Sequence, residues 1–229
     1  MPRRARIVLP DVTLHLIQRG NNRQACFFHA EDYRTYLEWL HEYACQCACE
    51  VHAYVLMTNH VHLLLTPSKA DSAGMLMKRL GQRYVQYINR TYRRSGTLWE
   101  GRFKSCLVNE GAYVLGCYRY IELNPVRAGM VEHPANYAWS SYRANAQNER
   151  SATITPHCLY RGLGRTPESR AGSYRELFRS HLEPGLVDDI RQATNGNYVL
   201  GSERYQLEVA AVLGRRVTRG KPGRPGKSP

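Results

Sequence analysis

Two histidines separated by one residue, His60 and His62, are the first candidates for chemistry in this sequence. They belong to a β-prone run over residues 60–65. Side chains alternate along a strand, so the two imidazoles project from one face about 7 Å apart, while Val61 and Leu63 point to the other face. Such a pair can bind one metal ion. Two half-buried histidines held by backbone hydrogen bonds are the alternative, and the pair alone does not decide between the two interpretations.

A tyrosine and an asparagine farther along the chain form the second candidate set. Tyr120 and Asn124 are four residues apart in a region of helical pattern, so they lie on one helix face, and a phenolic and an amide oxygen would face the same point. Asn124 could complete a metal site, and Tyr120 could act as a nucleophile. A tyrosine in such a helix is more often a core residue with its hydroxyl paired, which is the alternative for Tyr120.

The elements that must position these residues follow from the periodicity of the sequence. We expect strands over residues 12–18, 51–57, 60–65 and 102–109, and helices over 32–48, 73–94 and 110–123. The dipeptide Thr58-Asn59 supplies a hairpin turn, and Asn124-Pro125 should end the last of these helices. The order strand, helix, strand, strand, helix, strand, helix predicts an α+β fold. We expect a ferredoxin-like antiparallel sheet covered by helices on one face.

The composition changes after about residue 148. Residues 151–173 are rich in Gly, Pro, Ser, Thr and Arg, which is typical of a linker. We therefore predict a first domain over 1–148, a linker over 149–173, a small helical region over 174–213 and a basic disordered tail over 214–229. Short helices are expected at 174–182, 186–194 and 202–213. The tail contains too much Gly and Pro to fold alone.

The charge of the chain points to nucleic acid. The 229 residues include 32 Lys and Arg against 19 Asp and Glu, a formal charge of +13, and 43% of residues are hydrophobic, as in folded proteins. Cations interleaved with tyrosines crowd residues 75–103, a composition suited to phosphate contacts and base stacking. A solvated helix face with inward tyrosines is the alternative. The candidate DNA contacts are Arg3, Arg4, Arg6, Arg83, Arg90, Arg93, Arg94, Arg102 and Lys104.

Several other classes of protein are disfavoured. The sequence has no run of about 18 apolar residues and no secretory signal at its start, so we expect a cytoplasmic, nucleoid-associated protein with no membrane partner. Seven cysteines without a C-x-x-C pair argue against a disulfide framework. The Cys45-x-Cys47-x-Cys49 cluster matches zinc-ligand spacing poorly, and we expect reduced thiols there.

Five segments, in order, carry a resemblance to a known family. They are HLIQRGNNR from residue 15, YVLMTNHVH from residue 54, WEGRFKS from residue 99, YRYIELNPVRAG from residue 118 and WSSY from residue 139. Residues 12–142 thereby resemble the single-tyrosine HUH transposases, in particular the branch of REP-associated tyrosine transposases. The resemblance implies that His60 and His62 are the HUH metal ligands, that Tyr120 is the nucleophile and that Asn124 is the third ligand. The wider family more often has Gln at the position of Asn124.

The resemblance also implies an activity. A divalent metal ion, Mg²⁺ or Mn²⁺, would polarise a phosphodiester, and Tyr120 would attack it to give a covalent 5′-phosphotyrosine and a free 3′-hydroxyl. The substrate would be single-stranded or hairpin DNA, which is cut and rejoined, and the protein would be a homodimer. A regulator that binds hairpin DNA or RNA without catalysis is the alternative from another class. A replication initiator or relaxase is a further enzyme alternative, which the short chain disfavours.

Overall fold

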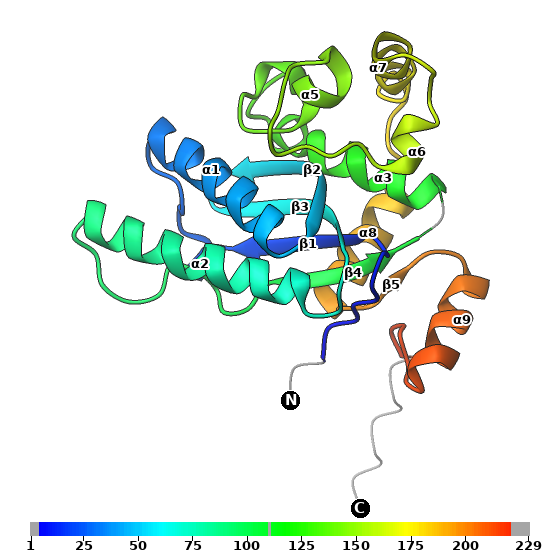
Figure 1. The fold of residues 1–229 in the computed structure, drawn as a ribbon, viewed down its shortest axis with the longest axis horizontal. Helices are drawn as coiled ribbons and strands as arrows, with labels where there is room; N and C mark the ends of the chain where they lie inside the picture. The colour runs from blue at the N-terminus through cyan, green and yellow to red at the C-terminus, as the bar shows by residue number, and fades with distance from the viewer. Residues whose placement is uncertain (1–4, 110, 221–229) are drawn as a thin grey trace, which may run out of the picture.

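A five-stranded sheet forms the centre of the molecule in the computed structural model, which describes residues 5–109 and 111–220 (Figure 1). The strands are β1 (Leu14–Arg19), β2 (Cys49–Met57), β3 (His60–Pro67), β4 (Lys104–Val108) and β5 (Val199–Leu200). Their order in the sheet is β2-β3-β1-β4-β5. The first four pair antiparallel in ferredoxin-like order, and β5 joins the free edge of β4 in parallel.

Helices cover both faces of this sheet (Figure 1). The long helices α1 (Ala30–Gln46) and α2 (Ser72–Thr91) pack on one face, and α3 (Gly111–Glu122) and α8 (Pro184–Gly196) lie on the other. The remaining elements are η1 (Asn21–Arg23), α4 (Asn124–Arg127), η2 (Pro134–Asn136), α5 (Tyr142–Gln147), α6 (Cys158–Arg161), α7 (Pro167–Glu176) and α9 (Glu203–Leu213).

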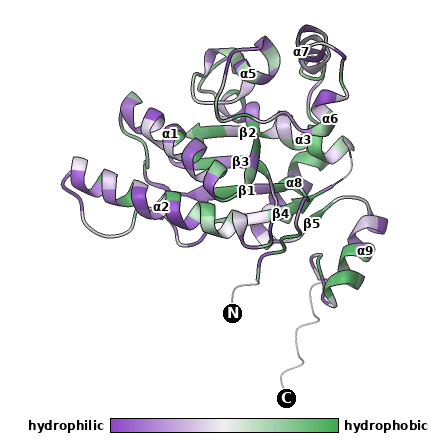
Figure 2. Cartoon of the chain, in the orientation of Figure 1, coloured by the Kyte–Doolittle hydropathy of each residue, from purple (hydrophilic) through white to green (hydrophobic). Residues whose placement is uncertain are grey.

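The alternation of side chains along β3 divides the interior into two cores. Val61, Leu63 and Leu65 pack under α1 and α2, while Leu64 packs under α3. Each fully buried aliphatic side chain contributes roughly 1.5–3 kcal/mol of transfer free energy, so both faces hold the strand in register. Figure 2 shows the consequence: the strands are mostly hydrophobic along their length, whereas α1 and α2 alternate between hydrophobic and hydrophilic positions. His62, on the same face as Leu64, is therefore fixed on the α3 side of the sheet.

Strand pairing places the predicted histidines beside β1. The turn after Met57 starts β3 at His60, which pairs with Met57 on β2. On its other side β3 pairs with β1, with His60 opposite Arg19 and His62 opposite Ile17. Because the register is held on both sides of β3, the two imidazoles have little freedom to move apart.

The predicted fold class is confirmed, and two details of it were wrong. The sheet has helices on both faces, and it is mixed because β5 adds a parallel strand. The two residues of β5 are too few to show an alternating pattern in the sequence. In the described residues, no helix is long and apolar enough to cross a membrane.

The prediction of a linker over 149–173 was wrong as well. This segment contains α6 and the start of α7, and Tyr160 and Ala171 are buried in the second core. Its polar composition reflects a helix start: the Thr166 hydroxyl accepts a hydrogen bond from the backbone N–H of Ser169, and Pro167 occupies the first helical turn. The helix expected at 174–182 is thus displaced toward the N-terminus, to Pro167–Glu176.

Part of the predicted disordered tail is also folded. Val217 is buried, and its carbonyl accepts a hydrogen bond from the N–H of Val199 in β5. Arg215 donates hydrogen bonds to the carbonyls of Ala5 and Arg6. Residues 221–229 of the tail, and the predicted DNA contacts Arg3 and Arg4, lie outside the described residues.

Candidate active site

One cavity, of about 280 Å³, collects the four residues predicted to carry the chemistry. Its lining includes His60 and His62 from β3, Tyr120 from α3 and Asn124 from α4. The His60 and His62 rings have centroids 5.1 Å apart and stand nearly perpendicular, at 80°. The Tyr120 ring lies 5.6 Å from the His62 ring and meets it edge-on. The cavity therefore brings His60 together with Tyr120, which lies 60 positions later in the same chain.

The end of α3 explains how Tyr120 and Asn124 come to share the cavity. Pro125 has no N–H to donate, so the α3 hydrogen-bond pattern is interrupted at this point and the helix ends at Glu122. The chain nevertheless continues with nearly helical geometry into α4, where the N–H of Arg127 donates to the carbonyl of Leu123. Tyr120 and Asn124, four residues apart, therefore still lie on the same side of the helix although the hydrogen-bond pattern is broken between them. Tyr120 is only 6% exposed but lines the cavity.

A hydrogen-bond chain determines the tautomer of His62. The Thr194 hydroxyl donates to the carbonyl of Ile190 at 2.7 Å, so its oxygen accepts from Nδ1 of His15 at 2.8 Å. His15 Nε2 then carries a lone pair and accepts from Nδ1 of His62, also at 2.8 Å. This leaves the lone pair of His62 on Nε2. A metal-binding histidine commonly donates its other ring N–H to a neighbouring group, so the hydrogen bonding of His62 is compatible with metal binding through Nε2.

The same logic applies to His60. Its Nδ1 lies 2.6 Å from Oδ1 of Asn59, and the Asn59 amide is oriented by a second hydrogen bond from Nδ2 to the carbonyl of Arg23. An amide oxygen only accepts, so His60 donates from Nδ1 and keeps its lone pair on Nε2. Both histidines thus present the same ring nitrogen as a potential ligand.

Burial keeps these imidazoles neutral at neutral pH. It lowers the pKa of His15 to about 3 and the pKa of His60 to about 4, with smaller contributions from Arg127 and Arg19 respectively. Burial likewise holds the pKa of His62 well below its usual range, and the neighbouring histidines and arginines add to the effect. A neutral imidazole is the form that binds metal ions. No proton therefore competes with an ion for these nitrogens at pH 7.

The donor set fits a divalent ion only if Asn124 or the substrate contributes. Among the residues that the structure describes, no group of three His, Cys, Asp or Glu side chains is placed to hold a metal. Two imidazole nitrogens and one amide oxygen from Asn124 leave positions for phosphate oxygens. All seven cysteines are free thiols in the structure, including Cys45, Cys47 and Cys49.

Three arginines that sequence reasoning did not single out complete the lining of the cavity. Arg19 comes from β1, Arg127 from α4 and Arg191 from α8. The Arg127 guanidinium lies 4.3 Å from the centre of the Tyr120 ring and donates a hydrogen bond to the Tyr120 carbonyl at 2.8 Å. No carboxylate lines this cavity within the described part of the chain. The arrangement is electrostatically suited to a phosphate group.

The predicted DNA-contacting cations that the structure describes are distributed over several elements. Arg6 and Arg102 line a second cavity, between β1 and α2, and Lys104 lines a small depression together with Arg102 at the end of β1. Arg83 is paired with Glu42 of α1 at 2.7 Å and lies over the Trp39 ring, so part of its charge is engaged within the protein. Arg90, Arg93 and Arg94 lie at the C-terminal end of α2 and just beyond it, and the Arg94 guanidinium contacts Phe28.

Fold and site together define a class: a ferredoxin-like α+β protein in which two histidines of one strand and a tyrosine of a flanking helix line a cationic cavity. Residues 9–124, just over half of the chain, match the family described as IS200-like transposases. The chain belongs to this family, and it is accordingly a transposase, an enzyme that acts on DNA.

Two solved structures align with this chain, and the first of them shares its fold. A REP-associated tyrosine transposase bound to a REP hairpin superposes with a TM-score of 0.57 at 16% sequence identity, covering 69% of this chain and 93% of that one. A candidate transposase from Deinococcus radiodurans aligns over 56% of this chain and 98% of that one, at 20% identity and a TM-score of 0.38. No curated protein matches the sequence.

Proposed function

We propose that this chain is a metal-dependent transposase that cuts and rejoins single-stranded, hairpin-associated DNA through a covalent 5′-phosphotyrosine on Tyr120. The observation that carries the proposal is the single cavity lined by Tyr120, His60, His62 and Asn124. A binding protein needs no such set, whereas phosphoryl transfer to a side chain needs a nucleophile and charge stabilisation at one point. The similarity to a REP-hairpin-bound transposase supports hairpin DNA as the substrate.

The arginines and Tyr120 have separate tasks in this reaction. Arg19 and Arg191 offset the negative charge of the incoming phosphodiester, and Arg127 holds the Tyr120 ring in place through its stacked guanidinium. The phenolic oxygen forms a bond to phosphorus, the bond from phosphorus to the 3′-oxygen breaks, and the phenolic proton is transferred so that a 3′-hydroxyl is released. The phosphotyrosine retains the bond energy that strand rejoining requires.

His60, His62 and Asn124 would hold the divalent ion. When bound there, Mg²⁺ or Mn²⁺ supplies positive charge that polarises the phosphodiester. The two imidazole nitrogens favour Mn²⁺ over Mg²⁺ in affinity, whereas the amide oxygen suits either.

The oligomeric state is a separate part of the proposal. We expect a homodimer that associates with the nucleoid, although Tyr120 and both histidines already line one cavity in a single chain. In the proposed dimer, Tyr120 of each subunit would act in the cavity of its own chain. Light scattering of the purified protein tests the dimer, and a mass of one chain would contradict it.

The central test is formation of a covalent adduct. Wild type, Tyr120→Phe and Tyr113→Phe are each incubated with a labelled single-stranded hairpin and Mn²⁺ and then separated under denaturing conditions. Tyr113 lies on the same helix and is the matched control. We expect an adduct with wild type and with Tyr113→Phe, and none with Tyr120→Phe. Hairpin binding without any adduct from the wild type would contradict catalysis and favour the regulator instead.

A further inference from the structure

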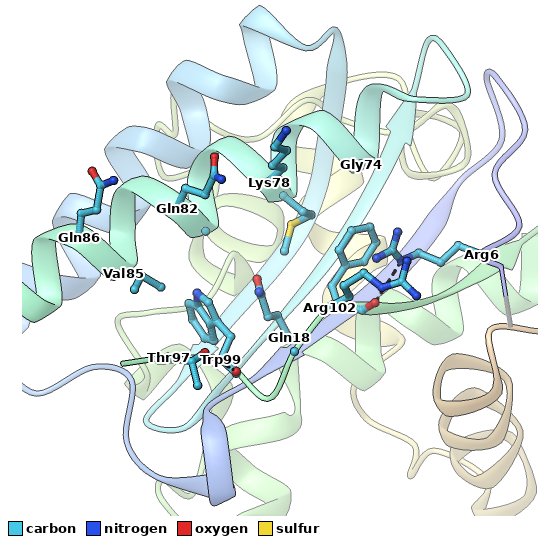
Figure 3. Close-up of a pocket in the computed structure, with 14 residues that line it drawn as sticks. Arg6, Gln18, Gly74, Lys78, Gln82, Val85, Gln86, Thr97, Trp99 and Arg102 are labelled. Atoms are coloured by element: carbon cyan, nitrogen blue, oxygen red, sulfur yellow. Dashed lines mark hydrogen bonds between the residues drawn. The ribbon is translucent and has the colours of Figure 1, made fainter. Parts of the chain in front are cut away.

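The larger cavity, on the opposite face of the sheet, is not used by the proposed reaction. It has a volume of about 710 Å³ and lies between β1, α2 and the loop before β4 (Figure 3). This volume is within the range of small-molecule and cofactor sites, roughly 300–1,000 Å³. On this wall α2 has a glycine, Gly81; a Cβ there would lie 3.8 Å from the Gln18 amide and from the Trp99 indole, so a larger side chain at this position would extend into the cavity.

Two buried polar groups line this cavity without partners. Oε1 of Gln18 and Nε1 of Trp99 have no hydrogen bond to any residue in the described part of the chain, although these residues are only 8% and 5% exposed. Figure 3 shows both side chains directed from the sheet side toward α2. Buried polar groups in native proteins are nearly always paired, so an acceptor and a donor left open together indicate a ligand that brings a donor and an acceptor.

The rim of the cavity is cationic. Arg6, Lys78 and Arg102 line it, and no carboxylate does so among the described residues. The Arg6 guanidinium lies 3.8 Å from the centre of the Phe103 ring and donates to the Phe103 carbonyl, which fixes its position. A flat ligand attached to phosphates would find hydrogen-bonding groups and aromatic edges inside, and positive charge at the opening.

The cavity is connected to the active site around the end of β1. Gln18 faces the larger cavity, whereas its neighbours Ile17 and Arg19 face the cavity of Tyr120, because side chains alternate along the strand. A small depression between the two shares Gly101 and Arg102 with the first cavity and Ile17 and Arg19 with the second. It is lined by Arg19, Arg102 and Lys104 against one acid, Glu100. A DNA backbone can therefore pass from one cavity to the other along a cationic path.

The geometry points to a nucleobase-binding pocket: Gln18 and Trp99 hydrogen-bond an unpaired base of the substrate strand a few nucleotides from the bond that Tyr120 attacks. Arg6, Lys78 and Arg102 contact the phosphates of that nucleotide. This inference rests on the proposed function in taking single-stranded DNA as the substrate. It adds a site that selects where the strand is placed, on the face of the sheet opposite the nucleophile.

The experiment is a double-mutant cycle between base and pocket. Each nucleotide of the single-stranded extensions flanking a hairpin is replaced in turn by an abasic analogue, and affinity is measured by fluorescence anisotropy at fixed salt. Proteins carry Tyr120→Phe so that no cleavage occurs. The pocket variants are Gln18→Leu, which removes the amide but keeps its volume, and Gly81→Leu, which fills the cavity from α2. Gln147→Ala, an exposed residue at the end of α5, is the control.

We expect one extension position at which removing the base weakens binding about tenfold with the unmodified pocket and with Gln147→Ala. With Gln18→Leu or Gly81→Leu, the intact DNA should already bind about tenfold more weakly, and removing that base should have little further effect. Thermal unfolding and circular dichroism establish that both variants fold. Two variants that act on different walls keep the test decisive if one of them is unstable.

Two results would overturn the pocket. The first is a loss of affinity on removing a base that is the same for the pocket variants and the control at every position of the extensions. The second is an equal loss of affinity for a hairpin without extensions, because that DNA has no unpaired flanking base. The adduct assay on Tyr120 is independent of this cycle: an adduct without coupling refutes the pocket alone, whereas coupling without an adduct refutes the proposed reaction alone.

Discussion

The hydrogen-bond chain from Thr194 through His15 to His62 makes a specific prediction about ion binding. His15 is buried, and both of its ring nitrogens are used, one for Thr194 and one for His62. The variant His15→Phe keeps a flat ring of similar size in the same place, so most of the packing is retained. It removes the acceptor for the Nδ1 proton of His62 and the donor to Thr194.

The size of the effect follows from which groups are left unpaired. Thr194 still donates to the carbonyl of Ile190, so its hydroxyl remains satisfied. The ring N–H of His62 is left buried without an acceptor, which costs about 1–3 kcal/mol of unfolding free energy. The tautomer of His62 is then no longer determined, and loss of such a supporting partner lowers metal affinity about 10–100-fold. We expect both effects in the same variant.

The assay compares two buried histidines. His52 is also fully buried and makes two hydrogen bonds, to the Thr155 carbonyl and the Thr66 hydroxyl, but it does not line the cavity of Tyr120. His52→Phe should therefore destabilise the fold to a similar extent and leave Mn²⁺ affinity unchanged. Calorimetric titration with Mn²⁺ and thermal unfolding measure the two quantities separately. Equal Mn²⁺ affinity in wild type and His15→Phe, or an equal loss in His52→Phe, would refute the reasoning.

Two further predictions concern pH. Burial lowers the pKa of His15 to about 3 and those of His52 and His60 to about 4. Below the ordinary histidine pKa of about 6.5, the unfolded chain therefore binds more protons than the folded one, and the unfolding free energy should fall as pH decreases from about 6.5 to 4. A urea midpoint that stays constant over this range would contradict the prediction. Burial raises the pKa of Glu122 to about 7, so the contribution of this carboxyl to the unfolding free energy is complete below about pH 4.5 and is lost as pH rises through 7. Glu122→Gln should therefore gain stability relative to wild type between pH 5 and pH 8. A difference in urea midpoint between the two proteins that does not change with pH would count against this prediction.

The histidine pair shows what a local pattern can determine. Alternation along one strand was enough to place His60 and His62 on one face, and the helical spacing placed Tyr120 with Asn124. His15 could have been found in the same way, because it lies on the same face of its strand as Ile17 and Arg19, at every second position. The sequence does not indicate which strand is the neighbour, since register depends on pairing between segments more than 40 residues apart.

The contact that α8 makes with His15 could not be predicted from local sequence patterns. Thr194 is 179 residues from His15, and nothing in the spacing of either residue indicates that they meet. The segment before it was misread for a related reason: a Ser-, Thr- and Pro-rich composition is shared by linkers and by short capped helices. Burial of Tyr160 and Tyr174 in the second core distinguishes the two, and burial is a property of the whole fold.

The position of Thr194 has a consequence for dissecting this enzyme. A polypeptide trimmed to residues 9–124, the stretch that matches the family, would retain His60, His62, Tyr120 and Asn124, the four residues to which the proposed reaction assigns a role. It would nevertheless lack the hydroxyl group on which the orientation of the His15 ring depends, together with Arg191. Under the proposed function, the C-terminal third of the chain therefore contributes to the catalytic site, and a minimal fragment should be less active than the intact protein.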